Sequence, residues 1–185
     1  MIGIYIYSKF FRKEMVKNII GADGHVFVYS LQDKFANYND AIAKIQQDFQ
    51  VLIAAPIIKS QVFVNSPSYS TGTEVYGLQV QDLKARHIFY NNMKYTMAKN
   101  ALAAFAKNEN IVFVGRIIAR NLQAKVGDTI TIISPNGYVT ALGSMPRIIS
   151  VKVGGIINTG MYQYDATTLL MPFGLAQTFF NYGNK

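Results

Sequence analysis

The sequence predicts a mixed α+β fold in which strands outnumber helices. Half of the 185 residues are hydrophobic, which is enough for a normal core. Runs of β-branched and aromatic residues recur along the chain, with short amphipathic segments between them. The two kinds of segment do not alternate regularly, so a doubly wound parallel fold is not expected.

The first fifty residues predict helix, strand and helix. Residues 10–20 place apolar side chains on one helical face, and residues 25–31 are dense in β-forming side chains. Asn37 or Asn39 can cap a second helix that ends near Phe49.

Two strands should follow. Residues 51–65 form a β-rich run that Pro56 interrupts, which suggests an edge position or a bulge. A turn cluster of Ser, Pro, Thr and Gly occupies residues 66–72. Residues 73–80 then predict a second strand.

The middle of the chain predicts helices around a short buried strand. Residues 82–110 are helical in tendency, residues 111–114 read as the strand, and residues 115–124 as a short helix. Residues 129–133 predict another strand after the Gly127-Asp128 turn.

Pro135-Asn136-Gly137 is the strongest hairpin signal in the sequence, and residues 147–153 predict the returning strand. The loop between them, residues 138–146, carries apolar side chains that either fold back on the domain or meet a partner. A turn is expected within residues 154–160. A strand at 168–171 and a helix at 173–180 complete the fold.

Charge and cysteine content narrow the function classes. The net charge is +8, but the basic residues are scattered, so nucleic-acid binding is not expected. They cluster tightly only near the start, at Lys9, Arg12, Lys13 and Lys17. The chain has no cysteine, which excludes disulfides, thiol nucleophiles and thiolate metal sites.

The sequence offers no arrangement typical of an enzyme. His25 and His87 lie far apart in sequence, so we expect neither a metal site nor a general base. There is no Gly-x-Ser-x-Gly elbow, no phosphate-binding Gly-rich motif and no assignable carboxylate pair. We therefore expect a non-enzymatic protein without a cofactor.

The chain as written shows no membrane anchor. No stretch approaches the roughly 20 apolar residues of a membrane span. Residues 1–11 are apolar but lack a basic leader and a cleavage site, so a signal peptide is not expected either.

One ordered series of segments is more specific than any single motif. The series consists of residues 114–122 (VGRIIARNL), 125–137 (KVGDTITIISPNG), 143–147 (GSMPR), 151–156 (VKVGGI) and 159–165 (TGMYQYD). It resembles the periplasmic domain of the LolC/LolE family of lipoprotein-releasing permeases, which is related to the MacB type. Shorter similarities to the same domain occur at residues 11–15, 24–26 and 54–56.

The resemblance implies a MacB-like periplasmic domain with two parts. Residues 1–80 match the first half of a porter-like α/β subdomain, and residues 81–185 match a β-rich Sabre subdomain with a hairpin at 134–147. Family members have membrane spans on either side of this domain. The resemblance therefore implies a fragment of an inner-membrane permease that acts on the periplasmic side.

In LolC-like members a hairpin "hook" captures the periplasmic chaperone LolA. The resemblance places that hook at residues 134–147 and implies a chaperone-binding role for Tyr138, Leu142, Met145, Pro146 and Arg147. It further implies a LolD-like ATPase, a second permease subunit and lipoprotein cargo as partners, with no nucleic acid.

Two alternatives stay open at this stage. The first is a MacB-type or FtsX-type permease domain that serves efflux or regulation, which would share the fold but have other partners. The second belongs to another class: a soluble enzyme or a soluble basic binding module, whose binding to DNA would fall steeply with salt.

Overall fold

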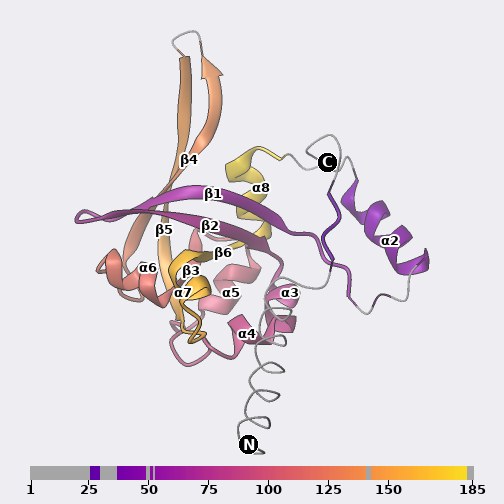
Figure 1. Cartoon of the computed structure of the whole chain (residues 1–185), viewed down its shortest axis with the longest axis horizontal. Helices are drawn as coiled ribbons and strands as arrows, with labels where there is room; N and C mark the ends of the chain where they lie inside the picture. The colour runs from indigo at the N-terminus through magenta and orange to yellow at the C-terminus, as the bar shows by residue number, and fades with distance from the viewer. Residues whose placement is uncertain (1–25, 30–36, 49–50, 52, 141–142, 183–185) are drawn as a thin grey trace, which may run out of the picture.

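The fold is a closed six-stranded barrel with helices packed around it (Figure 1). The computed structural model describes residues 26–29, 37–48, 51, 53–140 and 143–182. Within these residues the strand order around the barrel is β1-β2-β6-β3-β5-β4. The prediction of a mixed fold of strands and helices is thus confirmed.

The strands pair in both directions. β2 with β6 and β3 with β5 are parallel, whereas the other neighbours are antiparallel. Strands from both sides of residue 80 share this one barrel, and the division into two subdomains at that residue stays a prediction. The strands are β1 (Ile58–Asn65), β2 (Ser70–Leu78), β3 (Ile111–Gly115), β4 (Thr129–Thr140), β5 (Gly143–Ile157) and β6 (Thr168–Pro172).

The helices are short apart from the first. α2 begins after Asn37, whose side-chain oxygen accepts a hydrogen bond from the Asn39 backbone N–H at 3.2 Å, so Asn37 is the cap. The helices are α2 (Tyr38–Asp48), α3 (Val80–Ala85), α4 (His87–Tyr90), α5 (Ala101–Ala106), α6 (Arg116–Asn121), α7 (Tyr162–Thr167) and α8 (Phe173–Phe180).

Alternation along the strands divides the core into two clusters. In β3, Val112 and Val114 join one cluster with α6 and α8, whereas Phe113 joins a second cluster under α3, α4 and α5. Phe113 stacks on Phe105 of α5 with ring centroids 5.1 Å apart. The barrel is therefore buried on both faces of β3, which explains why that strand is apolar throughout.

Helix α8 packs closely against the barrel at Gly77 of β2. A Cβ atom at this glycine would lie 2.6 Å from the Cβ of Ala176. The absence of a side chain lets the helix approach the sheet. α8 also contacts β1, β4 and β5, so it lies at the base of the β4–β5 hairpin (Figure 1).

Several sequence predictions differ from the structure, among them the strand predicted at 51–65, which begins only at Ile58. The helical tendency over residues 82–110 resolves into separate helices, with left-handed backbone at Asn100 (φ 69°) and Asn108 (φ 57°) before and after α5. Within the predicted strand 25–31, residues 26–29 form no strand. Helix α7 was not predicted. The predicted helix at 10–20 lies outside the described residues.

Strand β5 is longer than predicted and runs on through Gly154 and Gly155. Its register with β3 skips one residue there, because Val112 pairs with Val153 and Phe113 with Gly155. A glycine accommodates such a bulge without a side-chain clash. The turn predicted within 154–160 comes at the end of that range, at Gly160 with φ 75°.

Candidate functional site

The candidate site is the outer half of the β4–β5 hairpin, which projects from the barrel (Figure 1). β1 pairs with β4 at residues 131–133, and β3 pairs with β5 from Lys152 onward. Beyond these points the two strands pair with each other alone. We call residues 134–140 and 143–147 the arm.

The turn predicted at residues 135–137 lies inside β4 and is not a turn. Ser134 pairs with Arg147 and Tyr138 with Met145, so three residues of β4 stand opposite Pro146. A Cβ atom at Gly137 would overlap the carbonyl oxygen of Met145. The Asn-Gly sequence therefore permits a bulge with close backbone contact, and the strand continues to Thr140.

The predicted partner-binding residues do not share one face of the arm. Met145 is 49% exposed, and Pro146 is also exposed. Because neighbouring side chains of a strand point to opposite faces, these two residues serve different sides of the arm. The Tyr138 backbone pairs with Met145, whereas the Tyr138 side chain and Leu142 lie outside what the structure describes.

Arg147 faces α8. Its guanidinium donates a hydrogen bond from Nη1 to the carbonyl oxygen of Phe179 at 3.3 Å. A cation near the C-terminal end of a helix is favourable because the last carbonyl groups lack partners in the helix. Opposite Arg147 in the ladder, Ser134 is fully buried. This contact ties the base of the arm to the helix beside it.

An apolar row at the arm's base was missed by the sequence reasoning. Phe63 pairs with Ile133, and Ile133 pairs with Ile148, so the three side chains share the outer face of the barrel. Phe63 is 51% exposed and Ile148 is 62% exposed. The alternation along β5, in which Ile149 and Val151 point inward and Ile148 points outward, is the sequence pattern that could have predicted this row.

The buried carboxyl group of Asp165 is hydrogen-bonded within the fold, whereas Asp82 Oδ2 and the hydroxyl groups of Ser134 and Thr168 are buried without a hydrogen-bond partner in the described chain. Asp165 accepts hydrogen bonds at Oδ1 from the backbone N–H and the hydroxyl of Thr159, both at 2.8 Å. Burial raises the pKa of Asp82 above its usual value, while Arg86 opposes the shift. Among the residues that the structure covers, no three His, Cys, Asp or Glu side chains gather where they could hold a metal ion.

No helix in the described part of the chain is both long enough and apolar enough to cross a bilayer. His87 is exposed on α4 and lies apart from the arm, and His25 falls outside the described residues.

Known proteins with similar sequences are bacterial transport components. The LolC transmembrane protein of the lipoprotein-releasing system of Neisseria meningitidis serogroup B is 23% identical over 155 residues, which cover 84% of this chain and 36% of the relative. The LolC protein of Xylella fastidiosa is 21% identical with the same coverage. The chain thus spans about a third of the length of these curated relatives.

A solved structure shows the same fold. The extracellular domain of the noncanonic ABC-type transporter YknZ from Gram-positive bacteria superposes with a TM-score of 0.50 at 14% identity, covering 84% of this chain and 74% of that one. The family described as MacB-like periplasmic core domain matches residues 1–184. Because that match spans nearly the whole sequence, the chain belongs to the family of MacB-like periplasmic core domains.

Proposed function

We propose that this chain is the periplasmic domain of an ABC transporter permease that releases lipoproteins from the inner membrane and passes them to a periplasmic chaperone. The relatives named LolC, which belong to lipoprotein-releasing systems, support the assignment. The observation that carries it is the arm, because a two-stranded ribbon that projects with exposed apolar side chains suits capture of a partner.

In this proposal the domain performs mechanical work only. A LolD-like ATPase and the membrane-spanning part of the permease, paired with a second permease subunit, supply the motion. The arm moves with the barrel because Arg147 fixes its base to α8. The lipoprotein then leaves the membrane, and its acyl chains pass to a LolA-like chaperone docked on the arm.

Met145 and Pro146, the described side chains proposed to touch the chaperone, are apolar and lie in the arm close to its base. Met145 supplies a flexible, polarizable contact, and Pro146 offers a rigid one. Tyr138 and Leu142 remain candidates on sequence grounds. Arg147, the fifth residue of this set, is hydrogen-bonded to the Phe179 carbonyl at the base of the arm, and we propose that it also pairs with an acidic group of the chaperone.

Binding of the full chain to a purified LolA-like chaperone, measured by surface plasmon resonance, tests the proposal. We expect Met145→Asp to weaken binding about ten-fold or more, because it places a charge in a desolvated contact. Leu142→Asp should act in the same way. The matched control is Tyr95→Asp, since Tyr95 is 88% exposed and lies outside the arm; it should leave binding unchanged.

A shortened arm gives a stronger version of the test. Ser134 and Arg147 are direct partners in the ladder, so a two-residue Asn-Gly turn can join them in place of residues 135–146. This variant should keep the circular dichroism spectrum and lose the chaperone. Undiminished binding without the arm would contradict the role proposed for the arm. Failure of the native chain, with its arm intact, to bind the chaperone would favour the MacB-type or FtsX-type alternative.

A further inference from the structure

Among the residues that the structure describes, no strand lies beside the outer edge of β5 just below the arm. β4 lies along one edge of β5 from Gly143 to Lys152, whereas β3 covers the second edge only from Lys152 onward. Along residues 143–151, no strand of the described chain occupies that second edge. An open edge presents backbone donors and acceptors to whatever approaches it.

The direction of these backbone groups follows from two hydrogen bonds. The Lys152 N–H donates to the Asn110 carbonyl on the β3 side at 2.9 Å, and the Val153 N–H donates to the Asp128 carbonyl on the β4 side at 2.8 Å. Directions alternate along a strand. The N–H and C=O groups of Ser150 and Ile148 therefore point away from β4, toward the open edge, where the described chain offers them no hydrogen-bond partner.

Prolines close the edges above this point. Pro146 has the same parity as Ile148 and Ser150, so its nitrogen, which carries no hydrogen, faces the open edge. Pro135 lies on β4 two residues beyond Ile133, the last residue that pairs with β1. Proline at such positions prevents a foreign strand from pairing. The backbone N–H and C=O groups of Ile148 and Ser150 therefore form a short accessible stretch of the β5 edge between Pro146 and the start of β3. We call this stretch the window.

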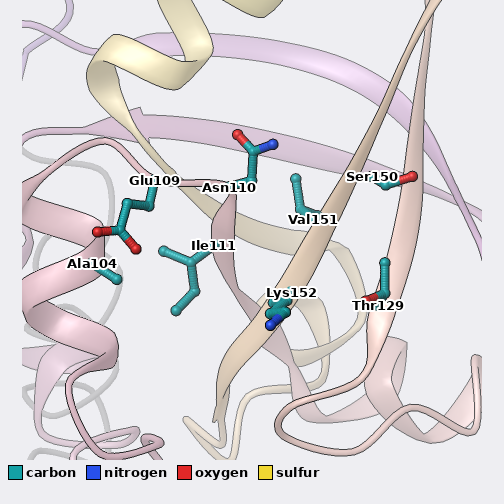
Figure 2. A pocket seen from close by; sticks show the side chains of 8 residues that line it. All are labelled: Ala104, Glu109, Asn110, Ile111, Thr129, Ser150, Val151 and Lys152. Atoms are coloured by element: carbon teal, nitrogen blue, oxygen red, sulfur yellow. The ribbon is translucent and has the colours of Figure 1, made fainter.

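A pocket of about 400 Å³ lies beside the window (Figure 2). Ser150, Val151 and Lys152 line it from β5, while Glu109 and Asn110 line it from the segment that leads into β3. The pocket brings a carboxylate and an ammonium group to its walls, in addition to the open backbone edge. Its charged and polar walls are exposed, so the pocket suits a polar side chain carried by an extended backbone better than an acyl chain, which would remove these groups from water without replacing their hydrogen bonds.

We propose that the window binds an extended segment of a partner protein, which adds a strand beside Ile148 and Ser150 in line with β3 and places a polar side chain between Glu109 and Lys152. This mode of recognition takes its affinity from main-chain hydrogen bonds and its selectivity from the neighbouring pocket. The window adjoins the proposed chaperone contact at Pro146 but does not involve Met145 or the end of the arm.

The test compares loss of the Ser150 backbone N–H with loss of the Ser150 side chain. Ser150→Pro removes the edge N–H but leaves the ladder with β4 intact, as Pro146 already does two positions beyond Ile148. Ser150→Ala is the matched control, because it removes only the hydroxyl. Displayed peptides of about ten residues, a length that forms one strand, are selected for binding to the full chain. Their affinities for the three proteins are then compared.

We expect selected peptides to bind Ser150→Pro about ten-fold more weakly than the native chain and Ser150→Ala within about two-fold. Bound peptide should also slow amide exchange at Ile148 and Ser150 in the native chain, which keeps the test valid if Ser150→Pro unfolds. Peptides that bind without slowing this exchange would overturn the proposal. So would a concentration-dependent dimer abolished by Ser150→Pro, which would assign the edge to a second copy of the chain.

Discussion

The barrel and the arm share strands β4 and β5 but have opposite physical characters. In the barrel, β4 and β5 each have a neighbour on both sides, and Ile132 and Val153 are almost fully buried. In the arm each strand has one neighbour, and Met145 is half exposed. A two-stranded ribbon alone is marginally stable in water. The comparison indicates that the barrel provides the stability, which leaves the side chains of the arm available for contact.

The largest effect should come from the barrel wall. Phe113→Ala removes a fully buried ring that stacks on Phe105, so the free energy of unfolding should fall by about 3–5 kcal/mol. Urea denaturation followed by circular dichroism measures the loss. Tyr162→Ala is the control, since Tyr162 is 75% exposed and should change stability by less than about 0.5 kcal/mol. Equal effects of the two substitutions would mean that β3 is not the interior strand described.

Gly137→Ala should disrupt the arm and spare the barrel. The new Cβ would overlap the Met145 carbonyl oxygen, so the two strands must separate beyond the bulge. Amide exchange in residues 138–145 should become about ten-fold faster or more, while the urea midpoint stays near that of the native chain. Gly72→Ala is the matched control in β2, because nothing lies within 4 Å of its new Cβ. A large fall in the midpoint for Gly137→Ala would make arm and barrel one cooperative unit.

Arg147→Ala tests the junction between the two regions. It removes the donor to the Phe179 carbonyl, and we expect a loss of about 1 kcal/mol in the free energy of unfolding. Amide exchange should accelerate at the end of α8 and at the base of the arm together. Lys152→Ala, an exposed basic residue on the same strand, serves as the control. If only the arm responds, the helix does not hold it.

The sequence predicted the presence of most strands better than the residues at which they begin and end. The short runs that became β3 and β6 were recognisable because burial on both faces leaves them almost entirely apolar. The turn at 135–137 was wrong because Asn-Gly specifies local backbone freedom, and the pairing partner decides whether that freedom forms a turn or a bulge. Closure of the barrel depends on pairings between distant segments, such as β2 with β6, which local patterns do not encode.

The candidate site shows the same limit. Residues 134–147 were found by family resemblance, and Met145 and Pro146 are indeed exposed there. The outer apolar row and the open edge of β5 depend on which residues stand opposite each other. Phe63 lies 70 positions before Ile133, its partner, so no local window of sequence could have joined them.

The smallest effect should come from the helical cover of the barrel, at Asp82 of α3. Burial raises the pKa of this carboxyl, so the folded chain keeps a proton that the unfolded chain releases above its pKa of 3.8. The free energy of unfolding therefore falls as pH rises from this value through the raised pKa. Asp82→Asn should remove that decline, by less than about 1 kcal/mol because the group is partly solvated. Urea denaturation at pH 4 and pH 7 measures the difference.

Arg86→Gln should steepen the decline of the free energy of unfolding with pH, because the Arg86 guanidinium opposes the rise in the pKa of Asp82. Equal pH dependence of the free energy of unfolding for the native chain and both variants would show that Asp82 is as well solvated in the folded chain as in the unfolded chain. Asp82 would then not be one of the buried groups that distinguish the barrel and its helices from the exposed arm.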